Sequence, residues 1–292
     1  VKIFWLDEAE PEYSVYDFEN YRYHLGPDIQ VGNVYPVMYA KTFFDGMKAA
    51  GQENIINLLR CAWAGSQRYG ALVWSGDIKS SFSSMKNQVA AGLNMGIAGI
   101  PWWTTDIGGF FGANIHDPEF HELLIRWFEY GCFCPVMRLH GYRWPLQPQY
   151  GTTGGATCIS GAPNEIWSYT DQVYKILSDY LRLRERMLPY ITELMKEAHE
   201  KGTPVMRPLF YDFSSDPNSW NIENEYMFGP KVLVKPITDK DSRETDVYLP
   251  AGAHWTNAWT GETFEGGQTV HIQAPLEQIP LFTRDGYVLP LK

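Results

Sequence analysis

The chain opens with Val1-Lys2-Ile3-Phe4-Trp5-Leu6-Asp7, an apolar run that ends in a carboxylate, and Pro11 follows closely. A run of this kind is typical of a buried strand that delivers a polar side chain to a loop. Similar runs occur at residues 55–62, 71–74, 97–103 and 133–139, and each ends at a polar residue, usually with glycine nearby. The sequence therefore predicts five buried strands with polar groups at their carboxyl ends.

Helical patterns separate several of these strands. Met85, Val89 and Leu93 fall on one face of a helix that follows a run of serines able to cap it, and residues 120–127 repeat the pattern. Alternating strands and helices predict a parallel sheet with helical crossovers, and polar groups at successive strand ends are typical of a (β/α)8 TIM barrel. Five strands predict a partial barrel, about strands 4 to 8, whose missing N-terminal half belongs to a longer protein. An open doubly wound sheet is the alternative.

The C-terminal third of the chain changes character. A long helix is predicted from Ser168, where Ser168 and Asp171 would form a capping box, and Pro189 is expected to kink or divide it. Beyond this helix, short alternating runs between glycine-rich turns predict a small all-β sandwich. We therefore place the C-terminal part of the barrel at residues 1–210 and the β-sandwich domain at residues 211–292.

The composition excludes several classes of protein. The 292 residues are 45% hydrophobic and carry a formal net charge of −10 with no run of Lys or Arg, which excludes a nucleic-acid partner. No apolar stretch of about 18 residues and no signal-peptide pattern occur, so neither a membrane span nor a secretory leader is predicted. The four scattered cysteines form neither a disulfide framework nor a zinc site, which mildly favours a reducing, cytoplasmic compartment.

Six motifs follow one another along the chain. The two that carry carboxylates at strand ends are Trp5-Leu6-Asp7-Glu8-Ala9-Glu10-Pro11 and Trp74-Ser75-Gly76-Asp77. The other four occupy residues 102–110, 135–141, 187–190 and 204–210. In this order they resemble the motifs of glycoside hydrolase family 31, and the resemblance covers essentially the whole chain.

The resemblance implies a role for nine side chains. Asp7 is the expected nucleophile, and Asp77 is the expected general acid/base, which must hold a proton near neutral pH. Arg60, Asp106 and His140 are expected to hydrogen-bond the hydroxyl groups of the sugar in the −1 subsite. The aromatic side chains expected to line the pocket and exclude water are Trp5, Trp74, Trp103 and Phe110.

Each assignment has a structural alternative. A strand-end Asp can cap a helix, a histidine can be a satisfied core residue, and Arg60 can be a buried ion-pair partner. Glu10 and Glu12 lie close to Asp7 in the sequence, but the resemblance assigns the nucleophilic attack to neither of them. The residues interpreted as structural, or as supporting others, are Cys61, Trp63, Arg68 and Arg138.

The mechanism implied by the resemblance is double displacement in a retaining, exo-acting α-glycoside hydrolase that needs no metal or cofactor. The expected substrate is an α-linked oligosaccharide or glycoside that loses xylose or glucose. Trp5 and Trp103 would crowd out a hydroxymethyl group, which favours an α-xylosidase over an α-glucosidase. The exact sugar, the aglycone and the oligomeric state stay open. Two other hypotheses stay open as well: an inactive carbohydrate-binding fragment without the N-terminal barrel strands, and a metal-dependent hydrolase that uses Asp7, Asp106 and His140.

Overall fold

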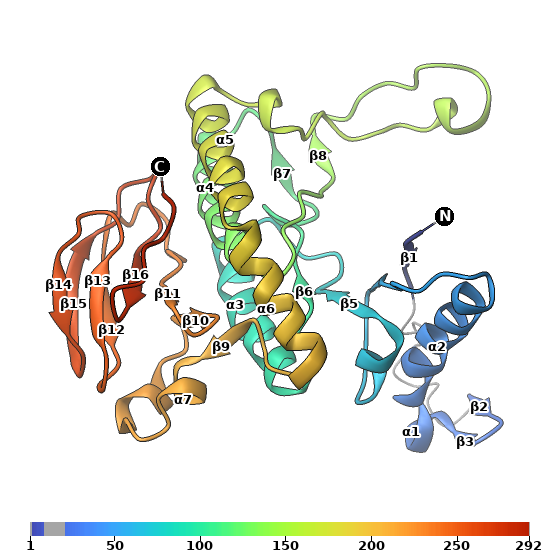
Figure 1. Cartoon of the computed structure of the whole chain (residues 1–292). Helices are drawn as coiled ribbons and strands as arrows, with labels where there is room; N and C mark the ends of the chain where they lie inside the picture. The colour runs from blue at the N-terminus through green and yellow to red at the C-terminus, as the bar shows by residue number, and fades with distance from the viewer. Residues whose placement is uncertain (1, 9–20, 292) are drawn as a thin grey trace.

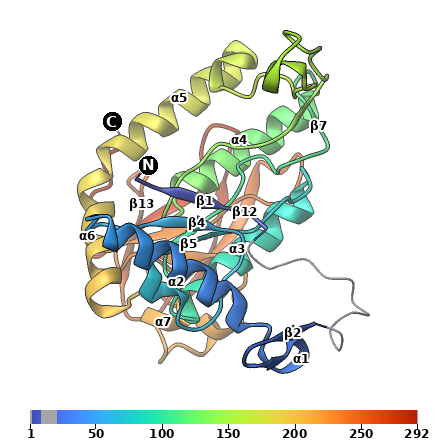
Figure 2. The same ribbon diagram turned by 90° about the vertical axis from the view of Figure 1, so that its right-hand side faces the viewer.

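A parallel four-stranded sheet forms the N-terminal part of the chain in the computed structural model, which describes residues 2–8 and 21–291 (Figure 1). Its strands, in spatial order, are β1 (Phe4–Leu6), β4 (Asn57–Leu59), β5 (Ala71–Trp74) and β6 (Trp103–Thr104). All three strand pairs are parallel, and Figure 2 shows β1, β4 and β5 side by side. Because all four strands run in the same direction, their carboxyl ends lie at one edge of the sheet.

Three helices accompany this sheet: α2 (Val34–Ala49), α3 (Phe82–Ile97) and α4 (Pro118–Cys132). The apolar face predicted for α3 is buried, and the Ser81 hydroxyl caps the helix by accepting a hydrogen bond from the Ser84 amide at 3.2 Å. The strand predicted at residues 97–103 is wrong over most of its length, because α3 continues to Ile97 and β6 begins only at Trp103.

The strand predicted at residues 133–139 is also wrong, because this segment forms no strand. It lies beside β6 through two backbone hydrogen bonds. The Val136 amide donates to the Trp103 carbonyl at 3.1 Å, and the Ile107 amide donates to the Arg138 carbonyl at 3.4 Å. Pro135 has no amide hydrogen, so a regular ladder cannot extend through it.

Two consecutive helices follow, α5 (Asp171–Arg186) and α6 (Leu188–Lys201), and they confirm that the long helix divides at Pro189. The predicted cap is wrong by two residues. The Thr170 hydroxyl accepts a hydrogen bond from the Val173 amide at 3.4 Å, whereas Ser168 ends the short helix η3 (Ile166–Ser168). The Ser168 hydroxyl instead donates a hydrogen bond to the Glu165 carboxylate at 3.0 Å.

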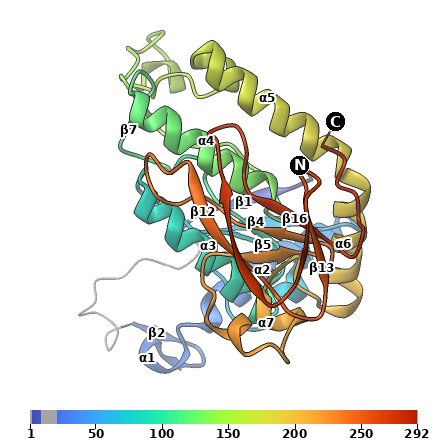
Figure 3. The same cartoon turned by 90° about the vertical axis from the view of Figure 1, so that its left-hand side faces the viewer.

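The C-terminal part is a β domain, which lies in front of the helices in Figure 3. One antiparallel sheet has six strands, in the order β14 (Thr263–Glu265), β13 (His254–Asn257), β16 (Leu281–Arg284), β11 (Val232–Val234), β10 (Tyr226–Phe228) and β9 (Met206–Pro208). A second sheet pairs β12 (Glu244–Leu249) with β15 (Gln268–Gln273). The domain boundary predicted at residue 211 stays a prediction, although β9 already belongs to the six-stranded sheet.

The six-stranded sheet buries both faces. Met227 and Trp255 pack in the core beneath β12 and β15, whereas Tyr226 and Phe228 belong to the larger core shared with the helices. This alternation follows from the two-residue period of a strand. The remaining short elements are β2 (Arg22–Tyr23), β3 (Gly26–Pro27), α1 (Asp28–Val31), η1 (Ser66–Tyr69), β7 (Ala113–Asn114), β8 (Arg143–Trp144), η2 (Gly154–Thr157), α7 (Leu209–Asp212) and η4 (Pro217–Asn221).

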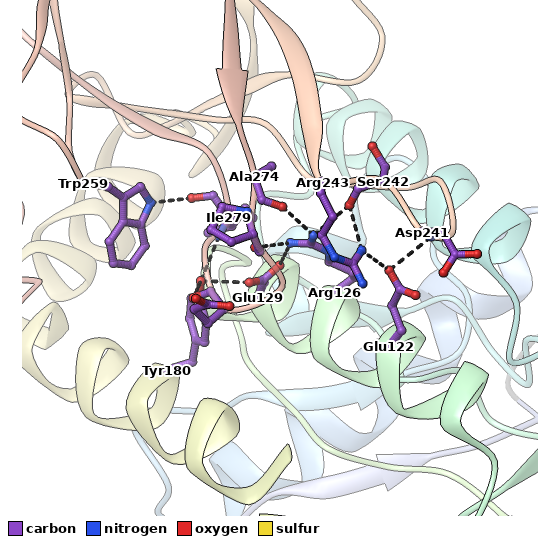
Figure 4. Close-up of polar contacts among 12 residues, drawn as sticks. Glu122, Arg126, Glu129, Tyr180, Asp241, Ser242, Arg243, Trp259, Ala274 and Ile279 are labelled. Carbon is purple, nitrogen blue, oxygen red and sulfur yellow. Dashed lines mark hydrogen bonds and ion pairs between the residues drawn. The ribbon is translucent and has the colours of Figure 1, made fainter. Parts of the chain in front are cut away.

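A buried polar network joins α4 and α5 to the β domain (Figure 4). Arg126 and Glu129 of α4 are fully buried, and the Arg126 guanidinium donates a hydrogen bond to the Glu129 carboxyl group at 3.1 Å. The Arg126 guanidinium also donates to backbone carbonyls of the β domain, including that of Ala274 at 2.8 Å. The Tyr180 hydroxyl of α5 donates to Glu129 at 3.0 Å and accepts a hydrogen bond from the Ile279 amide at 2.9 Å. These groups fix the β domain against the helices.

Candidate active site

Two neighbouring strands bring Asp7 and Arg60 together. Asp7 follows β1 directly and Arg60 follows β4 directly. The Nη1 atom of Arg60 lies 3.5 Å from Oδ1 of Asp7, and the Asp7 side chain is 54% exposed. The Asp7 carboxylate therefore lies beside a guanidinium and is accessible to a ligand.

Asp77 lies on the turn after β5, on the other side of β4 from Asp7, and is exposed. Gly76 has a φ of +75°, a conformation that side-chain-bearing residues rarely adopt. A Cβ atom at this position would also lie 3.3 Å from Nε of Arg60. Glycine therefore lets the Asp77 turn pass directly over Arg60.

Asp106 is fully buried and forms an ion pair with Arg138. Burial raises the pKa of Asp106; the charges of Arg138 and His140 oppose this rise, and that of Asp77 adds to it. The Oδ1 atom bonds Arg138, while Oδ2 has no hydrogen-bond partner among the residues that the structure describes. A buried carboxylate oxygen without a partner is suited to accept a hydroxyl proton from a ligand.

His140 lies between two aromatic side chains. Its ring centroid is 4.7 Å from that of Trp5 and 5.6 Å from that of Phe110, which stacks on it. Burial lowers the pKa of His140, although the nearby Asp106 charge opposes this effect. A neutral imidazole has one donor and one acceptor nitrogen, which suits hydrogen bonds to sugar hydroxyls.

Arg138 is the residue of this site that sequence reasoning missed, because we interpreted it as structural. Besides its pairing with Asp106, its Cζ atom lies 5.4 Å from the centroid of the Trp5 ring and 5.8 Å from that of Trp74. The two indoles meet edge to face at 5.6 Å. The spacing Arg138-x-His140 carried a signal, since alternate residues of an extended segment point to the same side.

Trp103 does not join this group. In the register of the sheet it pairs with Val73, whereas Trp74 pairs with Thr104. Trp103 therefore points to the opposite face of the sheet, where Gly92 of α3 leaves room for its indole: a Cβ atom at Gly92 would lie 2.8 Å from the ring. The predicted pocket position of Trp103 is wrong, and so is its part in the argument about sugar size.

The remaining expectations concern the acidic neighbours of Asp7, the cysteines, a metal site and a membrane span. Glu10 and Glu12 lie outside the described residues. Cys132 and Cys134 are buried thiols, and burial raises the pKa of each to about 12. Within residues 2–8 and 21–291, no three His, Cys, Asp or Glu side chains are grouped to hold a metal ion. No helix in this part of the chain is long and apolar enough to cross a membrane.

Comparisons with known proteins agree with this geometry. Residues 1–194 match the model of the glycosyl hydrolases family 31 TIM-barrel domain, and residues 202–289 match that of the family's C-terminal domain. The crystal structure of a family 31 α-xylosidase from a soil metagenome, complexed with xylose, is similar with a TM-score of 0.94 and 59% identity, over 99% of this chain and 43% of that one.

Curated relatives include an α-xylosidase of Saccharolobus solfataricus, 36% identical over all of this chain and 38% of its own length. An α-glucosidase of Bacillus thermoamyloliquefaciens is 34% identical over 90% of this chain and 30% of its own length. The chain thus spans less than half the length of these relatives. Its two matched domains nevertheless cover nearly all of its residues, and the chain belongs to glycoside hydrolase family 31.

Proposed function

We propose that this chain supplies the two catalytic carboxylates of a retaining α-glycosidase, with Asp7 as nucleophile and Asp77 as general acid/base. One observation carries the proposal: the two carboxylates end strands on either side of β4, whose Arg60 lies between them. Neighbouring strands are about 4.8 Å apart, so β1 and β5 lie about 10 Å apart. Side chains that lean toward β4 can therefore reach the separation of about 5 to 5.5 Å that a retaining mechanism needs.

The reaction proceeds in two displacements. Asp7 attacks the anomeric carbon while Asp77 protonates the departing oxygen, and a covalent glycosyl-enzyme forms. Asp77 then removes a proton from water, which releases the sugar with its original configuration. Asp106 and His140 hydrogen-bond the hydroxyl groups, and Trp5, Trp74 and Phe110 surround the sugar ring.

The preferred glycone that we propose is α-linked xylose, released from the non-reducing end of an oligosaccharide or glycoside. The 59% identity to an α-xylosidase structure that holds xylose supports this choice. Trp5 supports it as well, since it stands beside His140 and reduces the space for a hydroxymethyl group. α-Glucosides are the alternative, because α-glucosidases are among the relatives.

The test uses the protein expressed from its complete gene and a panel of nitrophenyl α-glycosides. We expect release from the α-xyloside, an α-configured first product by NMR, and loss of turnover in Asp7→Ala. Azide should restore reaction in that variant as a β-glycosyl azide, because a small anion can replace the missing nucleophile. Asp179→Ala, an exposed change on α5, is the control. Retained turnover in Asp7→Ala would show that the nucleophile is another residue.

We further propose that strands outside this chain complete the barrel. Within the described residues, β1 pairs only with β4, so one edge of β1 has free backbone groups. At the other end of the sheet, an open cavity of about 590 Å³ has a mostly apolar lining that includes Val136, Leu139 and Trp167, with Glu165 and Arg184 as its charged residues. Additional strands would satisfy the edge and cover these side chains.

Residues 1–292 expressed alone should then unfold without a sharp transition and should bind a hydrophobic dye, whereas the product of the complete gene should not. The isolated chain should also lack turnover. A sharp, cooperative transition of the isolated chain would contradict barrel completion and would favour an independent carbohydrate-binding unit.

A further inference from the structure

Glu8, the residue after the proposed nucleophile, has an unusual backbone conformation. Its φ is +51°, in the left-handed region that L side chains rarely adopt. Among the residues that the structure describes, only Asp241 and Asp285 share this feature without being glycine. Aspartate tolerates the conformation because its short side chain bonds the local backbone, whereas glutamate has no such advantage. Strained residues of this kind cluster at functional sites.

The conformation coincides with a specific contact. The Glu8 amide donates a hydrogen bond to Oδ1 of Asp7 at 2.9 Å. The ψ of Asp7 and the φ of Glu8 together orient the peptide plane between these two residues. In the observed orientation the Glu8 amide faces the Asp7 carboxylate, beyond the ladder of β1, which ends at Leu6.

A second donor reaches the same oxygen. Nη1 of Arg60 lies 3.5 Å from Oδ1 of Asp7. Within residues 2–8 and 21–291, no hydrogen bond or ion pair reaches Oδ2 of Asp7. Among the described residues, the two oxygens of this carboxylate therefore have different environments: Oδ1 is held by a backbone amide and a guanidinium, whereas Oδ2 has no partner.

We propose that Glu8 is a positioning residue whose left-handed backbone fixes Oδ1 of Asp7, so that Oδ2 is the oxygen that attacks the sugar. The inference rests on the proposed function. In the first displacement, a lone pair of Oδ2 forms the bond to the anomeric carbon. The bond from that carbon to the glycosidic oxygen breaks, and this oxygen takes the proton of Asp77. Oδ1 remains bonded to its two donors and becomes the carbonyl oxygen of the glycosyl ester.

The test compares side chains that differ in their tolerance of the left-handed conformation. Glu8→Asn and Glu8→Gly accept it, whereas the β-branched side chain of Glu8→Val opposes it. The rate of glycosyl-enzyme formation is measured on the protein from its complete gene, with an activated 5-fluoro-α-glycosyl fluoride and mass spectrometry. We expect this rate to be about 10- to 100-fold lower in Glu8→Val than in Glu8→Asn, the effect of one lost hydrogen bond to a charged group. KM should differ by less than about threefold, because the sugar-binding groups are elsewhere.

Asp241→Val, a change in the β domain, is the matched control. Asp241 has a φ of +59° and lies outside the site, so Asp241→Val imposes the same backbone conflict without touching Asp7. Its rate of glycosyl-enzyme formation should equal that of the unmodified protein. If thermal unfolding shows that the Glu8→Val variant is not folded, Glu8→Leu is used in its place.

The possible outcomes separate the two proposals. Equal rates in Glu8→Val and Glu8→Asn, with the label on Asp7, would overturn the role of Glu8 and leave the nucleophile intact. A loss confined to KM would also overturn it. A label on a residue other than Asp7 would overturn the proposed function itself.

Discussion

Replacing Glu129 with glutamine should change how the stability of the protein depends on pH. Glu129 lies in the network between α4 and the β domain, where burial raises its pKa from 4.5 to about 8 although Arg126 and Tyr180 oppose the rise. The folded protein therefore binds a proton at this site over a range of pH in which the unfolded chain has released it. The contribution of Glu129 to stability is complete below pH 4.5 and is lost as the pH rises through about 8.

The size of this contribution follows from the shift. One pKa unit corresponds to about 1.4 kcal/mol, so the full difference is about 5 kcal/mol at most. Between pH 5.5 and 7.5, the free energy of unfolding should fall by about 1 kcal/mol per pH unit because of this group. Glu129→Gln removes the titration, so this part of the slope should disappear. Other buried carboxyl groups with raised pKa values, such as Asp212 and Glu225, contribute equally to both proteins.

The assay is urea unfolding of the protein from its complete gene at several pH values between 5.5 and 7.5, with tryptophan fluorescence as the measured signal. Glu119→Gln is the control, because this carboxylate is on the same helix and pairs with Lys240 in solvent. The control should keep the slope of the unmodified protein. Parallel pH dependences of Glu129→Gln and the unmodified protein would refute the reasoning, since they would show that Glu129 is ionised in both states.

Three further predictions concern the site and the helix caps. Arg138→Met should lower kcat/KM about 100-fold, because the Asp106 carboxylate loses the partner that holds it ionised in the site. It should also lower the free energy of unfolding by about 3 to 5 kcal/mol, the cost of breaking a buried ion pair. Losing Arg138 raises the pKa of Asp106 further, so the variant should regain activity as the pH rises; a pH-independent loss would contradict this. Trp103→Phe should reduce stability by about 1 to 3 kcal/mol in urea unfolding. Trp103→Phe should change KM by less than about twofold, whereas Trp5→Ala should raise KM clearly. A larger effect of Trp103→Phe on KM would show that Trp103 lines the pocket after all. Thr170→Ala should lower the free energy of unfolding by about 1 kcal/mol, and Ser168→Ala should lower it by much less. A larger loss in Ser168→Ala than in Thr170→Ala would show that Ser168 caps the helix.

The sequence alone determined the features that depend on neighbours along the chain. The apolar runs before Asp7 and Asp77 make short strands of one sheet, and each run delivers its carboxylate to the segment that follows. The first strand is less buried than its apolar sequence predicts, since Trp5 is 48% exposed. Pro189 divides the long helix because it lacks an amide hydrogen and clashes with the preceding turn. The motifs around Arg60, Asp106 and His140 likewise indicated the family, which the matched domains show.

Only the tertiary structure decided the features that depend on pairing between distant segments. Trp103 sits on a strand of two residues, too short for an alternation pattern, and its register with Val73 turns it toward Gly92. Arg138 lies in the site because the segment after α4 folds back beside β6. A single arginine in the sequence carries no information about which carboxylate it pairs with. Register and long-range ion pairs are set by the packing of the whole sheet, so local sequence cannot specify them.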